Sequence, residues 1–277
     1  VNIMVALTNY DELVKTAISE NIDYIISGAG LPLHLPGLTE GSKTCLIPIA
    51  SSARSADITC KRWWSSFKRV PDAIVVEGAF AGGHLGFKRE DLADWNDRSL
   101  DSACTDVLDV AARWEKETGR HIPVIAAGGV WDGTDIARLL KLGVEGIQMG
   151  TRFLATEECG LSDDFKQLLI DSNIDDMVVI NSPAGLPGRA IKNELIKKIL
   201  NGEKAPIRCP YRCLRTCDPS AVSFCIAKAL VSAREGDIEN GLLMAGHNAY
   251  RIKEVVPVRQ LVDDLVREAL KAIAVAA

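Results

Sequence analysis

Aromatic side chains are scarce in this chain of 277 residues, at 5%, and histidine occurs only four times. No uninterrupted apolar run reaches the roughly 18 residues of a membrane-spanning helix, and no charged n-region precedes a cleavable apolar segment at the start. The net charge is -5 and no block of like charges occurs, so nucleic acid and acidic membranes have no electrostatic support as partners. We therefore expect a cytoplasmic protein that acts on a small molecule, and the sequence leaves its oligomeric state open.

Short runs rich in valine and isoleucine alternate with amphipathic segments through the first half of the chain. The runs are residues 1–7, 23–30, 44–51, 72–79, 122–130 and 144–151. Each run is nearly all apolar, which is typical of strands that are covered on both faces, and strands that alternate with helices predict a parallel α/β sheet. The helices are expected at residues 10–21, 57–69, 99–119 and 132–143, the last with Asp132 as its N-cap and Gly143 as its stop.

The number of strands points to a TIM-type (β/α)8 barrel that lacks its first two βα units. Six clear strands are present, the chain opens directly on one of them, and residues 177–185 could add a seventh. We expect residues 1–176 to form the barrel and residues 177–277 to form a C-terminal segment. That segment carries expected helices at residues 188–201, 219–235 and 258–274.

Two consecutive strand ends carry a pattern that suits a phosphate. The stretches "AAGGV" and "QMGT" place Gly128, Gly129, Gly150 and Thr151 where the strands give way to helices. Backbone N–H groups at helix starts bind phosphate, and barrels commonly bind it after strands seven and eight, so the six strands become strands three to eight. The alternative is a pair of ordinary βα turns. Because neither GxxxxGK[ST] nor an early GxGxxG occurs, the phosphate is expected to belong to a mononucleotide such as FMN.

Taken together, these motifs resemble those of the nitronate monooxygenase (2-nitropropane dioxygenase) family of FMN-dependent TIM-barrel enzymes. The resemblance covers roughly residues 1–200 and is carried, in this order, by "VNIM", "VEGAFAGGHLG", "PVIAAGGV", "QMGTRF" and "SPAGLPGRAIKN". Related flavin-dependent enoyl-acyl-carrier-protein reductases share the GGHxG stretch. The family's N-terminal Gly-Gly-Met segment has no counterpart in this sequence.

The resemblance implies a role for each matching residue. The phosphate would be held by Gly128, Gly129, Gly150 and Thr151, with Gln148 close by, and the rest of the flavin would be contacted by Asn2, Glu77, Ala81, Gly82 and Gly83. His84 would be the active-site base, and its ordinary pKa near 6.5 suits removal of a proton beside a nitro group or a thioester. The flanking glycines would let the backbone approach the flavin. The alternative for His84 is a helix-capping or core histidine.

A cysteine-rich stretch, "CPYRCLRTCDPSAVSFC", follows the resembling region and has no counterpart in the family's general pattern. Its four thiols, Cys209, Cys213, Cys217 and Cys225, could bind zinc or a [4Fe-4S] cluster, or could simply be reduced cysteines in a turn. Three interleaved arginines, Arg208, Arg212 and Arg215, would lower the thiol pKa values.

Three functions remain open on these grounds. The first is FMN-dependent oxidation of alkyl nitronates or nitroalkanes with O2, with His84 as base. The second is NAD(P)H-dependent reduction of an enoyl thioester. An electron-transfer metal at the cysteines would slightly favour this second function. The third is a non-catalytic remnant of a barrel that serves as a binding or assembly module.

Overall fold

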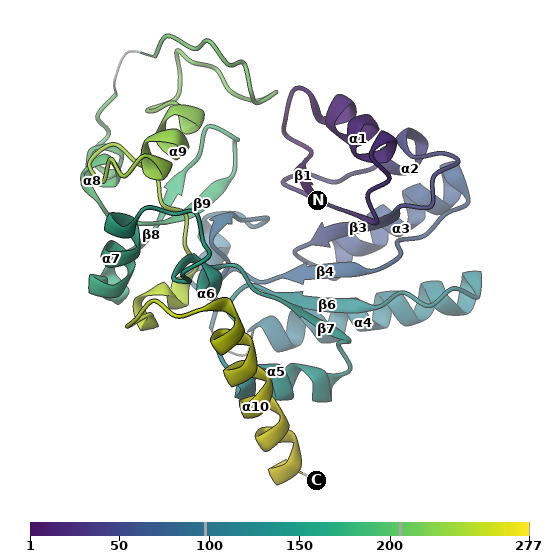
Figure 1. Ribbon diagram of the computed structural model, residues 1–277. Helices are drawn as coiled ribbons and strands as arrows, with labels where there is room; N and C mark the ends of the chain where they lie inside the picture. The colour runs from purple at the N-terminus through teal and green to yellow at the C-terminus, as the bar shows by residue number, and fades with distance from the viewer. Residues whose placement is uncertain (97–98, 205–206, 277) are drawn as a thin grey trace. The chain divides into compact units, whose positions relative to one another are not determined.

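The computed structural model of the chain describes residues 1–96, 99–204 and 207–276 (Figure 1). Two compact units interleave along the sequence. Unit 1 comprises Val1–Ala79, Asp94–Ala127 and Leu139–Gln148, and unit 2 comprises Phe80–Ala93, Gly128–Arg138 and Met149–Ala277. The division expected between residues 176 and 177 stays a prediction.

Unit 1 is built on a parallel sheet of six strands. They are β1 (Asn2–Met4), β2 (Tyr24–Gly28), β3 (Cys45–Ala50), β4 (Ile74–Glu77), β6 (Val124–Ala127) and β7 (Gly146–Gln148). The strand order is β1-β2-β3-β4-β6-β7, so each strand pairs with the one that precedes it in this sheet, as in a TIM-type barrel. All six strands match the apolar runs, and the parallel α/β fold is confirmed.

The helices of unit 1 cover this sheet because their apolar stripes need burial. They are α1 (Tyr10–Ser19), α2 (Leu35–Leu38), α3 (Ala53–Phe67) and α4 (Ser99–Thr118). In Figure 1, α3 and α4 run beside the strands, and α4 packs against both β4 and β6. Trp63 of α3 is fully buried in a cluster with Ile25 and Leu46, which ties the helix to the sheet.

Helix α5 (Gly133–Leu142) confirms the two expected boundary signals. The Asp132 carboxylate accepts hydrogen bonds from the backbone N–H groups of Thr134 and Asp135, both at 3.1 Å, as an N-cap should. Gly143 follows the last helical residue with φ of +108°, a conformation that glycine adopts without strain.

Unit 2 contains a second, antiparallel sheet that the sequence did not indicate. Its strands are β5 (Gly83–His84), β9 (Pro187–Ile191) and β8 (Met177–Asn181), in the order β5-β9-β8. The expected seventh strand at residues 177–185 is therefore wrong as a barrel strand, because β8 pairs antiparallel with β9 and not with the parallel sheet.

The remaining helices of unit 2 lie between and after its strands in the sequence. They are α6 (Thr151–Leu154), α7 (Asp163–Asp171), α8 (Glu194–Leu200), α9 (Ile226–Arg234) and α10 (Val258–Ala276), with 3-10 turns at Glu90–Leu92, Ile174–Asp176 and His247–Arg251. The helix expected at residues 188–201 starts later than predicted, because β9 takes the first residues and the Asn193 side chain caps α8 at the backbone N–H of Ile196. The helix expected from residue 219 likewise begins only at Ile226. Within the described residues, no helix combines the length and the apolar character needed to cross a membrane.

Candidate active site

His84 lies on β5, a strand of only two residues. Gly83 pairs with Arg189 and His84 pairs with Gly188, so β9 holds the histidine backbone in place. Gly82 is required for a different reason, since a Cβ atom there would come within 2.5 Å of the Ala245 carbonyl carbon. The glycine before this strand therefore accommodates protein backbone, whereas the sequence had suggested approach to a cofactor.

The His84 side chain makes a short hydrogen bond to a serine that lies far away in the sequence. Its Nε2 atom is 2.7 Å from the Ser182 hydroxyl oxygen, which also accepts a hydrogen bond from the backbone N–H of Ala184 at 3.2 Å. Burial lowers the pKa of His84 below its ordinary value of 6.5. The imidazole is therefore neutral at pH 7 and has a nitrogen able to accept a proton.

Arg189 places a buried positive charge beside the same segment. The side chain is 5% exposed, and its Nη1 donates a hydrogen bond of 2.9 Å to the Ala81 carbonyl oxygen. Its guanidinium also lies 6.0 Å from the centre of the Phe80 ring. Burial lowers the pKa of Arg189 to about 10, so the group remains protonated near neutral pH.

Sequence reasoning gave no role to Ser182 or Arg189. Both belong to the stretch "SPAGLPGRAIKN", which entered only as part of the family resemblance. Each is polar and nearly buried, at 7% and 5% exposure, inside a glycine-rich stretch with few other polar residues. The pairing of Arg189 with Gly83, the residue before the candidate base, would have identified it, but that pairing is visible only in the fold.

A C-terminal segment of unit 2, residues 242–251, contacts the glycine-rich stretches. The backbone N–H of His247 donates to the Phe80 carbonyl at 2.9 Å, and the two rings stack with centroids 4.4 Å apart. The Asn248 side chain donates to the Gly129 carbonyl at 2.8 Å. The sequence assigned His247 no role, and the structure places it directly against the residue that precedes Ala81.

The expected phosphate turns are present, but only one of them adjoins a helix. Gly128 and Gly129 have φ of +82° and +110°, which favours glycine at both positions. Helix α5 starts only at Gly133, whose backbone N–H donates to the Glu268 carboxylate at 3.0 Å. Asp132 and Glu268 therefore cap α5, and the phosphate role of Gly128 and Gly129 stays a prediction that rests on the backbone of their own turn.

The second turn leaves room for a ligand. A Cβ atom at Gly150 would meet nothing within 4 Å, so space is open at the start of α6. The neighbouring Thr151 hydroxyl oxygen accepts a hydrogen bond of 2.9 Å from the Gly246 backbone. Unit 2 thus contains an open position next to the Thr151 hydroxyl group and, separately, a two-glycine turn at residues 128–129. Each of them suits a phosphate.

The expected flavin contacts of unit 1 do not all lie in one row of the sheet. Glu77 pairs with Ala127, and Ala127 pairs with Gln148, so the glutamate and the glutamine share the carboxyl edge. Asn2 pairs with Ile26 at the amino end of β1, in a row four residues before that of Glu77. Burial raises the pKa of Glu77 to about 7, which makes its carboxyl group a partial hydrogen-bond donor at neutral pH.

The four cysteines of the cysteine-rich stretch are all free and partly exposed. Among residues that the structure describes, no three His, Cys, Asp or Glu side chains form a group able to hold a metal ion. Burial and neighbouring thiols raise the pKa values of Cys213 and Cys217. The expectation that the interleaved arginines lower them is wrong, because no arginine contributes to either shift.

Comparisons with known proteins bear on the whole chain. Residues 1–268 match the sequence profile of the nitronate monooxygenase family. A probable nitronate monooxygenase of Staphylococcus saprophyticus is 36% identical over 129 residues, which are 46% of this chain and 34% of that protein. A hydroxy-methyl-oxo-octahydroindene-carboxyl-CoA dehydrogenase of Mycobacterium tuberculosis is 36% identical over 134 residues, which are 48% of this chain and 33% of that protein. The matched part thus spans about a third of either relative.

Solved structures share the fold over nearly the full chain. FabK from Thermotoga maritima superimposes with a TM-score of 0.76 at 27% identity and covers 99% of this chain and 76% of its own. A nitroalkane oxidase from Streptomyces ansochromogenes has a TM-score of 0.72 at 23% identity over 97% of this chain and 70% of its own, which shows a common fold. With the profile match over residues 1–268, these findings show that the chain belongs to the nitronate monooxygenase family.

Proposed function

We propose that the chain is part of an FMN-dependent oxidoreductase in which His84 is the active-site base and alkyl nitronates or nitroalkanes are oxidised with O2. The observation that carries this proposal is the half-buried imidazole held at 2.7 Å from the Ser182 hydroxyl, with a pKa that burial lowers. A histidine that is neutral at pH 7 can accept the proton from the carbon beside a nitro group. Membership of the nitronate monooxygenase family supports that substrate class.

FMN fits the glycine turns described above. Gly128, Gly129, Gly150 and Thr151 would hold its phosphate, with Gln148 close by. The rest of the flavin would be contacted by Ala81, Gly82 and Gly83 together with Asn2 and Glu77. When bound, FMN supplies the capacity to accept two electrons. The open space at Gly150 supports the phosphate assignment, while the other contacts rest on the family resemblance.

The chain's own residues would manage the proton and the charge. His84 would take the α-proton of a nitroalkane, and Ser182 would keep the imidazole from rotating away from it. The charge of Arg189, protonated near neutral pH, would favour an anionic nitronate over the neutral nitroalkane in its vicinity. Because the arginine is buried, its charge is screened less by water than that of a surface side chain.

A comparison of two substrates tests the role of His84. The His84→Ala variant should keep bound flavin and lose turnover of a neutral nitroalkane by at least about a hundredfold. It should keep most of its turnover of the preformed nitronate, because that substrate has already lost the proton. The exposed His34 offers a matched control, and His34→Ala should behave as wild type. Unchanged nitroalkane turnover in His84→Ala would remove His84 from the mechanism.

A second candidate is NAD(P)H-dependent reduction of an enoyl thioester, as the sequence also left open. It is favoured by the similarity to FabK over 99% of the chain and by a relative whose name specifies a CoA compound. Anaerobic mixing of the flavin-loaded protein with NADH and crotonyl thioester separates the reactions. Bleaching of the flavin by NADH, followed by reoxidation with the thioester and not with nitronate, would favour reduction.

The third possibility, a non-catalytic module, is tested by colour alone. Flavin absorbance in the purified protein would contradict it, and a folded colourless protein that takes up no added FMN would support it. No role is given to a metal at the cysteines, since the four thiols form no ligand group within the described part of the chain. Zinc, iron and acid-labile sulfide analysis of the protein checks this point directly.

A further inference from the structure

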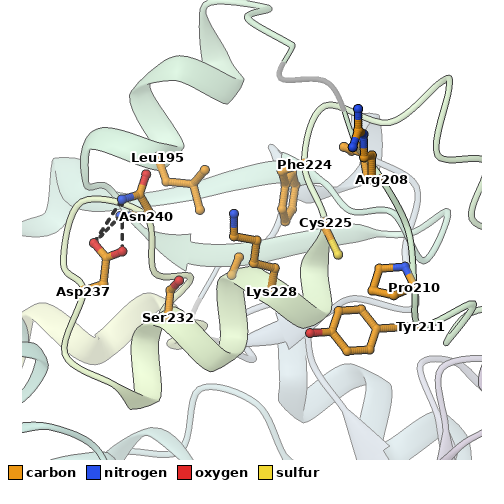
Figure 2. Close-up of a pocket in the computed structure, with 12 residues that line it drawn as sticks. Leu195, Arg208, Pro210, Tyr211, Phe224, Cys225, Lys228, Ser232, Asp237 and Asn240 are labelled. Atoms are coloured by element: carbon orange, nitrogen blue, oxygen red, sulfur yellow. Dashed lines mark hydrogen bonds between the residues drawn. The ribbon is translucent and has the colours of Figure 1, made fainter.

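A pocket of about 610 Å³ lies in unit 2, apart from the residues assigned to flavin or to proton transfer. Its walls come from α8, α9, the segment Ile207–Tyr211 and the turn after α9 (Figure 2). The volume is in the range of pockets that bind small organic ligands. None of its lining residues has a role in the proposed reaction.

The pocket offers apolar and aromatic surface to a ligand. Phe224 and Ala229 form a buried lining, at 5% and 4% exposure. The Tyr211 side chain is 54% exposed at the edge, and Figure 2 shows its ring beside Pro210. An exposed aromatic ring at the edge of an apolar hollow suits a flat heterocyclic group.

Two cations line the same pocket. Figure 2 shows the amino group of Lys228 between Leu195 and Phe224, while Arg208 lies on the other side of Phe224. Among the described residues, neither Lys228 nor Arg208 has an ion-pair partner within 4.0 Å. Their charges are available to a ligand.

The one acidic residue of the lining is already engaged. The Asp237 carboxylate accepts hydrogen bonds from the backbone N–H of Asn240 at 3.0 Å and from its side chain at 3.1 and 3.0 Å (Figure 2). These bonds, rather than an ion pair with Lys228, are the main reason that the pKa of Asp237 is lowered. Asp237 keeps its negative charge, so the described lining, with Lys228 and Arg208 against this one carboxylate, carries a net positive charge.

One segment of the pocket wall, residues 207–228, has the same character in sequence. Residues 207–228 contain four basic side chains and one acidic side chain, in a protein whose net charge is -5. The basic residues are Arg208, Arg212, Arg215 and Lys228, and the acidic one is Asp218. A basic, partly aromatic pocket in an acidic protein selects for an anion that carries a flat apolar group.

We propose that this pocket binds the phosphorylated adenosine of a nucleotide co-substrate. Lys228 and Arg208 would bind phosphate groups, and Tyr211 and Phe224 would contact the purine. The polar side chains of Ser232 and Asn240 lie in the same lining and can hydrogen-bond to the base or the ribose. Two molecules carry this group, a CoA thioester and NAD(P)H.

Three successive hydrogen bonds connect the cysteine-rich stretch, which also contributes to the pocket wall, to the candidate base. Thr216 belongs to the same cysteine-rich segment as the wall residues, and its hydroxyl donates to the Ala184 carbonyl at 3.0 Å. Ala184 in turn donates its backbone N–H to Ser182, the partner of His84. The inference rests on the proposed function in one respect: both candidate nucleotides are co-substrates of the second candidate reaction, the reduction of an enoyl thioester. Its test measures binding alone, without turnover.

Isothermal titration of the 277-residue protein with a set of related probes tests the proposal. Adenosine bisphosphate should bind, while pantetheine and inorganic phosphate should bind at least about tenfold more weakly. Titration with CoA, NADH and NADPH then identifies the source, since the tighter of these ligands is the co-substrate. A protein that shows no saturable binding of any adenosine probe would overturn the proposal.

Variants locate the binding in this pocket. Lys228→Ala and Arg208→Ala should each weaken binding about tenfold, the usual value of a charge-assisted hydrogen bond. Lys271→Ala, which removes an exposed lysine of α10 outside the pocket lining, should bind as wild type. Wild-type affinity in both pocket variants would place the nucleotide elsewhere and overturn the proposal. His84→Ala should bind the probe within about twofold of wild type, so failure of the reaction assigned to His84 leaves this test intact.

Discussion

Glu77 carries a carboxyl group in a place where its charged form is costly. Burial raises its pKa from 4.5 to about 7. The folded state therefore holds this proton more tightly than the unfolded state does. Below pH 4.5 Glu77 is protonated in both states, and its burial does not lower the free energy of unfolding. As the pH rises from 4.5 to about 7, the free energy of unfolding falls.

We predict that Glu77→Gln stabilises the flavin-free protein at pH 8 by up to about 3 kcal/mol, because the amide never ionises. At pH 4.5 the variant and wild type should be nearly equal. Urea unfolding at the two pH values measures the difference. Glu12→Gln, at an exposed position of α1, is the control and should show no such pH dependence. A Glu77→Gln effect of the same size at both pH values would contradict the shifted pKa.

In the proposed reaction Ser182 would act through His84, to which it is hydrogen-bonded, and would be a positioning residue. We predict that Ser182→Ala lowers kcat for nitroalkane oxidation about tenfold with little change in KM, the value of one hydrogen bond. Ser182→Thr keeps the hydroxyl and should restore most of the activity. Since the base must be neutral and burial lowers the pKa of His84, wild-type kcat/KM should fall only as the pH drops below 6.5. Loss of the hydrogen bond should move this limb, and an unmoved limb with unchanged kcat would show that Ser182 has no such role.

At the scale of the elements, the glycines near the site fall into two kinds. A Cβ atom at Gly82 would approach the Ala245 carbonyl carbon at 2.5 Å and the Gly246 nitrogen at 2.6 Å, so backbone would have to move. A Cβ atom at Gly150 would meet nothing within 4 Å, and its φ of -119° suits alanine. The first glycine is needed for packing, while the second leaves space.

These two positions predict opposite outcomes on substitution by alanine. Gly82→Ala should destabilise the protein by about 1–3 kcal/mol, the usual cost of overpacking. Gly150→Ala should leave the free energy of unfolding within about 0.5 kcal/mol of wild type and weaken FMN binding at least about tenfold, because the methyl group takes the space of the phosphate. Gly160→Ala, another open position, is the control for both measurements. Undiminished FMN affinity in Gly150→Ala would place the phosphate elsewhere.

Elements that depend on local pattern were predictable from the sequence. The six parallel strands follow from apolar runs such as residues 74–77, whose first three side chains are fully buried. The limits of α5 follow from Asp132 and Gly143. Strand β9 was mistaken for helix because its conformation is imposed by pairing with β8, as between Val179 and Arg189, and the stretch itself carries no strand alternation.

The candidate site was likewise predictable where its residues stand out locally, and not where they meet through long-range contacts. His84 and the glycine turns stand out locally as polar or glycine residues at strand ends. Ser182, however, meets His84 across 98 residues of sequence, and no spacing rule connects the two. The hydrogen bond from the Gly133 backbone N–H to Glu268, 135 residues away, is equally invisible, and it occupies the start of α5, near which the sequence had predicted a phosphate.

At the scale of the whole molecule, one segment of the chain has a charge opposite in sign to the net charge of the protein. The protein has a net charge of -5, yet residues 207–228 carry four basic side chains against one acidic one. An anionic nucleotide is repelled by the average field of such a protein and attracted by this segment. Because the Debye length is about 10 Å at 0.1 M salt, exposed charges such as Lys228 are screened strongly above that concentration.

We therefore predict that the affinity for adenosine bisphosphate falls several-fold between about 50 mM and about 300 mM NaCl, as measured by isothermal titration. In Lys228→Ala the same increase in salt should cost less affinity, since one of the screened attractions is already gone. Lys271→Ala should retain the wild-type salt dependence. Binding driven mainly by the apolar lining of Phe224 and Ala229 would instead be unchanged or tighter at high salt, and that result would assign recognition to the purine rather than to the phosphates.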